Sequence, residues 1–316
     1  EETRSNGLIY SGIYNSTSGV NNLNQFIQAE KITKDLNPTY GSIQKLFSRQ
    51  TDLIAFCEDR VVKIQANKDA IFNADGNPQL IASNRVLGQT MPFAGDYGIS
   101  KNPESFAKEN YRAYFTDKQR GAVLRLSMDG LTPISEYGMS DYFSDKLKLN
   151  SNLLGSFDGD KNEYNLTLAT SEVTISFDEK VKGWTSFKSF VPEESITMSN
   201  DYYTFKDGQI YLHHVEQDSS QNIVSRNNFY GVQYNSSVEV LLNEQPSIVK
   251  TYKTLNYEGT DSRVIKETTR KETGYHNIQD KDGWYSTYIK TDKNEGKVPE
   301  FIKKEGKWFN FIKGED

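Results

Sequence analysis

The chain has 316 residues and a formal net charge of −6, with 37 lysine and arginine residues against 43 aspartate and glutamate residues. Because basic side chains are not in excess, the composition excludes a protein that coats nucleic acid by neutralising its phosphates. A single cysteine, Cys57, excludes an intrachain disulfide framework, and no run of about 18 apolar residues is present to span a membrane.

The first 50 residues combine a strand-like opening with a predicted short helix. The chain begins without Met and runs directly into GLIYSGIY, so we expect it to be a fragment that lacks an N-terminal portion. The following stretch favours a short helix, with Asn21 or Asn22 as its N-cap. Pro38 then ends this helix and Gly41 completes a turn.

From Asp52 onward, apolar or alternating runs separated by short polar turns predict a mainly β protein. The aromatic content of 12%, from 19 Tyr and 17 Phe, supports this because such rings pack well on pleated, half-buried surfaces. Strands are expected at 111–115, 122–127, 131–134, 163–168, 172–179, 184–190 and 236–243, with tight turns at 58–60 and 206–208.

The predicted hairpins recur about every 40 to 60 residues, a spacing typical of β-propeller blades, each of which is a four-stranded meander. We therefore expect a β-propeller-like body over residues 1–255. A β-sandwich or an irregular β assembly remains an open alternative.

The composition of the sequence changes after residue 255, and a small β-hairpin domain is predicted over residues 256–316. Its last hairpin is FIKKEGKWFNFIK, with Gly306 at the turn. Aromatic hairpins of this kind often dock on a partner. Trp308, Phe309 and Phe311 are therefore candidate partner-docking residues.

The stretch DGDKNE offers oxygen ligands for calcium at Asp158, Asp160 and Asn162. An EF-hand loop starting at Asp158 would need Gly at its sixth position and Glu at its twelfth, where this chain has Glu163 and Ala169. Because Asp, Asn and Gly also dominate ordinary turns, a plain turn is the favoured interpretation, and we expect no metal and no cofactor.

The stretch SFDEKVKGWTSF partly matches the Asp-box of sialidase propellers. Ser176 and Asp178 fit that box, but three extra residues precede Gly183, and Trp184 comes before Thr185. The box is structural and performs no chemistry. Glycoside hydrolysis is therefore disfavoured, although paired carboxylates could still meet in the fold.

The histidines do not form a predicted site. His213 and His214 are adjacent, so in a strand they would point to opposite faces, and His276 lies far along the chain. No nucleophile elbow, zinc-binding helix motif or phosphate-binding glycine loop is present. The residues predict a protein built for surfaces, and not an enzyme.

Several long segments resemble a family of virion structural proteins, the tail stabilisation, nozzle or muzzle proteins of crAss-like and marine short-tailed phages. The segments that carry this resemblance are NNLNQFIQAEKITKDLNPTYGSIQKLFSR, DLIAFCEDRVVKIQANKDAIFNADGNPQL, VLGQTMPFAGDYGISKNPESFA, YRAYFTDKQRGAVLRLSMDGLTPISEYGMSDYF, VKGWTSFKSFVPE, TYKTLNYEG and PEFIKKEGKWFNFIKG. They span nearly the whole chain.

The resemblance implies a structural role in the phage tail. The chain would be a nozzle subunit that assembles with copies of itself into a ring, contacts other tail proteins and lets DNA pass without sequence-specific binding. Residues 155–187 would form one blade, in which Trp184, Gly183 and Tyr164 are structural: Trp184 anchors the packing and Gly183 permits the turn.

Two other functions remain open at this point. A tail-borne glycan- or receptor-binding module would present an exposed aromatic platform on one face. A tail-borne glycan hydrolase, the less favoured alternative, would need a cluster of carboxylates in a deep cleft.

Overall fold

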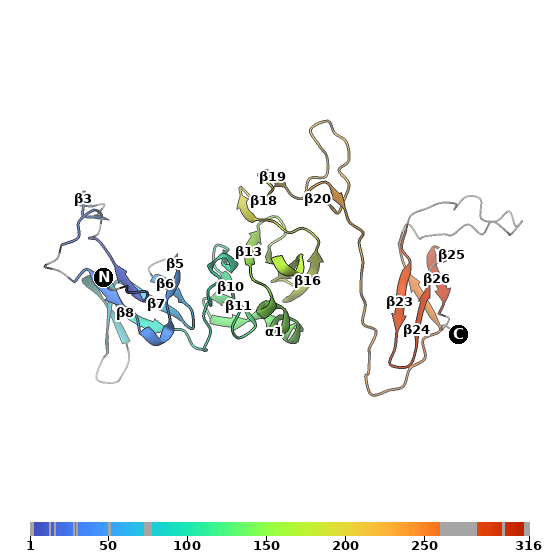
Figure 1. Cartoon of the computed structure of the whole chain (residues 1–316), viewed down its shortest axis with the longest axis horizontal. Helices are drawn as coiled ribbons and strands as arrows, with labels where there is room; N and C mark the ends of the chain where they lie inside the picture. Colours follow the sequence, from blue (N-terminus) through green and yellow to red (C-terminus); the bar gives the residue numbers. More distant parts are fainter. Residues whose placement is uncertain are drawn as a thin grey trace, which may run out of the picture. The chain divides into compact units, whose positions relative to one another are not determined.

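The computed structural model describes residues 3–12, 14–15, 17–27, 29, 31–49, 52–72, 78–259, 283–298 and 301–312 (Figure 1). The chain divides into two compact units, residues 1–236 and 237–316, which we describe separately. The mainly β fold class is confirmed, since the described residues form many small antiparallel sheets and one α-helix. The predicted domain boundary after residue 255 stays a prediction.

Three four-stranded meanders and one three-stranded meander make up most of the first unit, each with its strands in chain order. The first sheet contains β5 (Ile43–Arg49), β6 (Asp52–Cys57), β7 (Val61–Phe72) and β8 (Pro78–Pro92). The second contains β9 (Ala107–Lys108), β10 (Ala113–Asp117), β11 (Ala122–Ser127) and β12 (Gly130–Pro133). The third contains β13 (Leu153–Asp158), β14 (Glu163–Leu168), β15 (Val173–Asp178) and β16 (Gly183–Lys188). The fourth contains β17 (Glu194–Met198), β18 (Asp201–Lys206) and β19 (Gln209–Leu212).

Successive sheets pack face to face through shared cores. Phe56 of the first sheet meets Phe115 of the second edge to face, with ring centroids 5.0 Å apart. Tyr114 points from the opposite face of the second sheet and stacks on Tyr164 of the third at 4.8 Å. This alternation follows from the strand period of two, which sends neighbouring residues of β10 into different cores.

A glycine lets β13 of the third sheet lie directly against the 3₁₀ turn Pro103–Ser105, which precedes β9 of the second sheet. Gly155 of β13 lies so near the carbonyl oxygen of Ser105 that an added Cβ would fall far inside 3.0 Å of it. The same carbonyl accepts a hydrogen bond from the Tyr164 hydroxyl at 3.1 Å. The backbones therefore touch here because residue 155 has no side chain.

The N-terminal segment covers the outer face of the first sheet. Leu8 and Leu36 pack against Cys57 and its neighbours, and β1 (Gly7–Ile9) pairs with β4 (Thr33–Asp35). Short strands β2 (Tyr14–Asn15) and β3 (Val20–Asn21) form a separate pair.

The short helix predicted near the N-terminus differs from the structure. Asn21 belongs to β3, and its side chain accepts a hydrogen bond from the Leu23 amide at 3.1 Å, which forms a turn instead of a helix cap. A single 3₁₀ turn, Pro38–Tyr40, lies further along. Pro38 begins this turn where the prediction had it end a helix, because its fixed φ and missing N–H suit a first helical position.

The α-helix of the described structure, α1 (Ser140–Leu149), follows the second sheet. It buries Phe143 and Leu147 in the core between the second and third sheets. Three further 3₁₀ turns, at Pro103–Ser105, Ile134–Glu136 and Ala169–Ser171, connect strands of these sheets. No helix in the described part of the chain is long and apolar enough to cross a membrane.

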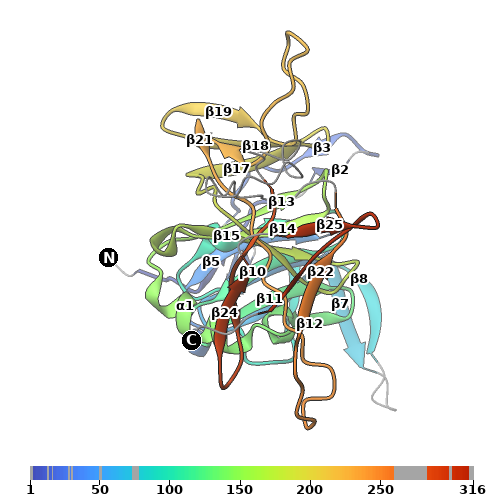
Figure 2. The ribbon, with the colours of Figure 1, turned by 90° about the vertical axis from the view of Figure 1, so that its right-hand side faces the viewer.

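The last strands of the first unit form a hairpin of two short antiparallel strands, β20 (Asn228–Phe229) and β21 (Val232–Gln233). Figure 2 shows β17, β18 and β19 side by side, with β19 at the outer edge of the fourth sheet.

The second unit contains two small sheets. In one, β26 (Lys307–Phe311) pairs with β22 (Thr254–Tyr257) and β25 (Ile302–Lys304). In the other, β23 (Ser286–Lys290) pairs with β24 (Glu295–Val298). The predicted hairpin around Gly306 is confirmed, and Gly306 takes the left-handed conformation, with φ of 80°, that this turn requires.

Candidate functional site

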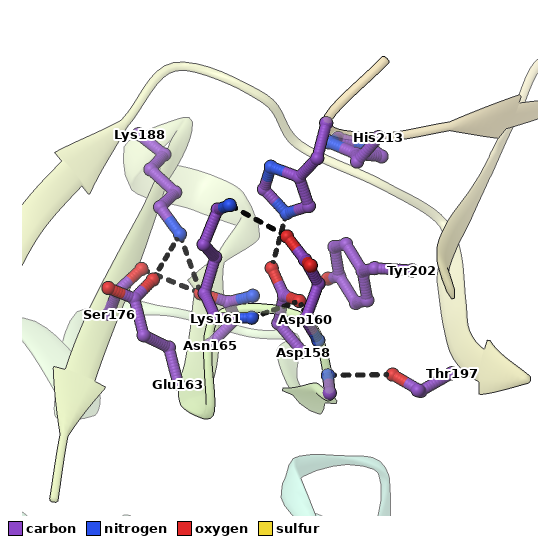
Figure 3. Close-up of polar contacts among 12 residues, drawn as sticks. Asp158, Asp160, Lys161, Glu163, Asn165, Ser176, Lys188, Thr197, Tyr202 and His213 are labelled. Carbon is purple, nitrogen blue, oxygen red and sulfur yellow. Dashed lines mark hydrogen bonds and ion pairs between the residues drawn. The ribbon is translucent and has the colours of Figure 1, made fainter. Parts of the chain in front are cut away.

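A group of polar and charged side chains in mutual contact lies where the third sheet meets the fourth (Figure 3). Asp158, the last residue of β13, is its centre, with a side chain only 1% exposed. One carboxylate oxygen lies 2.6 Å from Nε2 of His214, which follows β19. The other accepts hydrogen bonds from the backbone amides of Asp160 at 3.1 Å and Lys161 at 3.2 Å.

These contacts decide the charge of Asp158. Burial opposes ionisation, but the hydrogen bond and charge of His214, the Lys161 amide and the charge of Lys188 outweigh it and hold the pKa of Asp158 below its usual value. Asp158 is therefore a carboxylate near neutral pH. It closes its own turn and also joins that turn to the fourth sheet.

His213 sits in a different environment from its neighbour. Its ring packs edge to face on Phe190 at 4.8 Å, and its Nε2 lies 2.8 Å from the hydroxyl of Thr204. Burial, with the charge of His214, lowers the pKa of His213 to about 4. The two histidines thus have separate partners, and His213 is neutral at physiological pH. His276 lies outside the described residues.

A second group of contacts crosses the third sheet. Lys188 of β16 lies 2.6 Å from the Glu163 carboxylate and donates to the Asn165 side-chain oxygen at 3.3 Å. Ser176 donates to the same Asn165 oxygen at 2.6 Å. These residues share one face of the antiparallel ladders β14–β15 and β15–β16, the second of which has a register shift after Ser176, so the charges of Lys188 and Glu163 satisfy each other.

Two hydroxyls complete the junction between the sheets. Tyr202 of β18 lies 2.8 Å from the hydroxyl of Ser156, and burial raises the pKa of Tyr202. Thr197 of β17 donates to the Phe157 carbonyl and accepts from the Gly159 amide. The whole arrangement can fix the fourth sheet on the third, and each named charge in it already has a partner within the protein.

The calcium candidates lie together in this turn. Asp158 is engaged by His214, Asp160 forms an ion pair with Lys161 at 2.7 Å, and Asn162 takes the left-handed turn conformation with φ of 57°. Within the described residues, no three His, Cys, Asp or Glu side chains are placed to hold a metal. An Asp turn explains these positions without an ion.

Trp184 and Tyr164 lie in the core between the second and third sheets. Trp184 packs against Phe143 with ring centroids 4.5 Å apart, and its indole N–H donates to the Ile134 carbonyl at 3.1 Å. Tyr164 is fully buried.

The role predicted for Gly183 needs correction. The left-handed residue of this turn is Lys182, with φ of 51°, and no atom lies closer than 3.8 Å to a Cβ added at Gly183. The residue that adopts the left-handed conformation in this turn is therefore Lys182, one position before the predicted Gly183.

The three docking candidates of the second unit differ in how deeply they are buried. Trp308 is only 4% exposed, packs with Phe301 in that unit's own core and donates to the Gly259 carbonyl at 3.0 Å. Its proposed docking role is corrected to a core role, because its face of β26 is already covered. Phe309 is partly buried, whereas Phe311 is 61% exposed.

The pairing of Asp158 with His214 was not anticipated. The two residues are 56 positions apart, and only the packing of the third and fourth sheets brings them together. No local signal in the sequence marks the pair, since Asp158 was interpreted as part of an acidic turn and His214 as part of no site.

Two family models match the chain. The model described as Crassvirus muzzle protein matches residues 26–208, and the model described as Crassvirus muzzle protein C-terminal domain matches residues 224–315. No curated protein matches the chain.

Similar solved structures include the virginiamycin B lyase of Staphylococcus aureus, with 10% identity and a TM-score of 0.30, covering 60% of this chain and 61% of that one. A streptogramin B lyase has 12% identity and a TM-score of 0.29, covering 61% and 62%. A luciferin-regenerating enzyme has 9% identity and a TM-score of 0.26, covering 60% and 76%. The chain spans about three fifths of the two lyases, and similarity at this level carries no argument about activity.

Proposed function

This chain belongs to the crassvirus muzzle protein family, a component of the virion tail, and on that premise we propose that it forms part of the distal ring, or nozzle, through which DNA is ejected. The observation that carries the proposal is the pair of family matches, which together cover most of the chain. The chain is a crassvirus structural protein, and the nozzle position is the further step.

The geometry of the polar cluster supports a structural role over catalysis. Hydrolysis would need a carboxyl group free to give or take a proton next to the substrate. Asp158, Glu163 and Glu179 are instead paired with His214, Lys188 and Arg125, the last pair at 2.8 Å. Their contacts account for the cluster as a rigid junction between sheets, so we propose that the chain is not an enzyme.

The distribution of charge supports passage of DNA past the first unit. Residues 237–316 contain 14 acidic and 14 basic side chains, so the whole net charge of −6 falls on residues 1–236. An acidic inner wall would repel the phosphates of DNA and let the duplex slide. We propose that the first unit faces the lumen of a ring closed by head-to-tail contacts between copies.

Cryo-electron microscopy of purified virions, with an antibody raised against this chain, tests the nozzle proposal. We expect the antibody on a rotationally symmetric ring at the distal end of the tail, with acidic residues of the first unit lining its lumen. Antibody labelling elsewhere on the virion would contradict the nozzle proposal, and a ring whose acidic residues face outward would contradict the acidic wall.

Glycan binding is a second candidate function, favoured by one observation. Three aromatic residues of the second unit are exposed within five positions: Trp284 at 46%, Tyr285 at 43% and Tyr288 at 55%. Exposed rings can stack on sugars, in contrast to Trp184 and Trp308, which pack inside the protein. Quenching of tryptophan fluorescence by cell-surface glycans, lost in Trp284→Ala, would support this function, and no quenching would contradict it.

A further inference from the structure

The fourth sheet is one strand shorter than the three before it. The first, second and third sheets each contain four strands in chain order, whereas the fourth ends with β19 in third place. The strands in third place in the second and third sheets, β11 and β15, are mostly buried. In β19, by contrast, Ile210 is 65% exposed and Leu212 46% exposed. In a four-stranded sheet the third strand has a neighbouring strand on each side, whereas β19 has one only on the side of β18.

The free edge of β19 carries unpaired backbone groups. The His213 amide donates to the Tyr202 carbonyl at 2.9 Å, so odd-numbered residues of this strand bond to β18. In an antiparallel ladder the alternate residues, Ile210 and Leu212, then direct their N–H and C=O groups away from β18. Among the strands that the structure describes, none pairs with this side of β19. Such an edge accepts an added strand.

The chain also contains a strand-like segment without a sheet. The sequence predicts a strand at 236–243, yet residues 237–242, SVEVLL, belong to no strand in the described structure. The side chains of Val238, Val240, Leu241 and Leu242 are 70%, 65%, 87% and 56% exposed. A β-branched, alternating segment of this kind gains most by pairing, which would cover its apolar side chains and its backbone together.

We propose that residues 237–242 of a second copy of this chain add to β19 as the missing fourth strand. Val238, Val240 and Leu242 would extend the apolar face that Ile196, Tyr203, Phe205, Ile210 and Leu212 form on the fourth sheet, where Ile196 is 44% exposed.

A second copy fits as the partner because each chain carries one acceptor edge and one donor segment. Repeated donation from copy to copy is a head-to-tail contact, the kind that closes into a ring. The inference rests on the proposed ring, because the ring supplies the second copy, and it adds the contact by which neighbouring copies would join.

Cysteine cross-linking of the full chain tests the pairing. One tagged chain carries Ile210→Cys, and a differently tagged chain carries Val238→Cys, Val240→Cys or Leu242→Cys. We expect a disulfide between the two chains at one or two of the three positions, because a ladder has a fixed register. Native Cys57 is buried, and burial raises its pKa to about 11, so the unsubstituted chain is the control and should not cross-link.

Two outcomes of this experiment would overturn the inference. One is the absence of a cross-link between chains at all three positions. The other comes from a further variant that carries Ile210→Cys and one of the three segment cysteines in the same chain. A cross-link that forms only within that chain would mean that the segment folds back on its own β19.

Self-association gives a second readout that does not depend on disulfide geometry. Val240→Pro removes an amide from the proposed ladder, and we expect it to weaken association about tenfold, the factor for one lost buried backbone hydrogen bond. Val249→Pro is the matched control, because Val249 is 91% exposed and lies outside the segment. Equal sedimentation of the two variants, or a wild-type chain that stays monomeric at every concentration, contradicts the inference.

The virion experiment separates this inference from the proposed function. A distal ring without cross-links at β19 leaves the nozzle standing and removes the strand exchange. Antibody labelling away from the distal tail removes the nozzle, whatever the cross-linking shows.

Discussion

Replacement of Gly155 by alanine should destabilise the first unit more than any other single methyl group added to the third sheet. The new Cβ would fall on the carbonyl oxygen of Ser105, so the two backbones must separate by about 1 Å. Overpacking of this kind costs about 1–3 kcal/mol. The separation also takes the Ser105 carbonyl away from the buried Tyr164 hydroxyl, a further cost of about 1–3 kcal/mol.

The expected loss is therefore about 2–6 kcal/mol, a large part of the 5–15 kcal/mol that stabilises a typical domain. Urea unfolding followed by tryptophan fluorescence measures it, because Trp184 lies in the same core. Gly183→Ala is the matched control in the same sheet, since no atom lies within 3.8 Å of its added Cβ, and we expect a change below about 0.5 kcal/mol. Equal unfolding midpoints for the two variants would refute the reasoning that β13 and the 3₁₀ turn at Ser105 meet backbone to backbone.

Three further predictions concern the polar cluster and the second unit. Burial lowers the pKa of His213 from 6.5 to about 4. As the pH falls below 6.5, His213 therefore takes up a proton in the unfolded chain before it does so in the folded chain. Stability should fall by about 3 kcal/mol between pH 6.5 and 4, a loss that thermal melts should not find in His213→Gln. Asp158→Asn should cost about 1–3 kcal/mol by urea unfolding, while Asp160→Asn at the surface should cost under about 0.5 kcal/mol; equal losses would contradict the junction role. Trp308→Ala should destabilise the second unit by about 3–5 kcal/mol and the exposed Phe311→Ala by under about 1 kcal/mol, and calorimetry that ranks them in reverse would return Trp308 to the docking surface.

Elements held by local signals could be predicted from the sequence. The strand at 122–127 coincides with β11, and the strand at 163–168 coincides with β14, because apolar runs between polar turns mark a strand whatever surrounds it. The turn at 206–208 lies between β18 and β19 as predicted. Helix α1 was missed, although Phe143 and Leu147, four positions apart, carry its buried face. Two apolar residues are a weak pattern until a core exists to bury them.

The contacts between sheets had no local signal. Gly183 looked like the glycine that its turn needed, yet the demand fell on Lys182, and the glycine that the fold cannot replace is Gly155, inside an ordinary strand. Trp308 was predicted to dock on a partner, but it is buried in the core of the second unit, where β22 and β25 pair with its strand β26. Ser105, which decides the role of Gly155, and β22, which pairs with the strand of Trp308, come from distant parts of the chain.

The sequence by itself determined the mainly β class, most strand positions and the tight turns, because strand alternation and turn chemistry act over a few residues. Tertiary structure alone decided that Asp158 meets His214, that Gly155 touches Ser105 and that β19 ends its sheet as an open edge. Those outcomes depend on which faces of successive sheets are buried against each other. That choice is made by the sum of many apolar contacts between segments far apart in the chain, and no short stretch of residues encodes it.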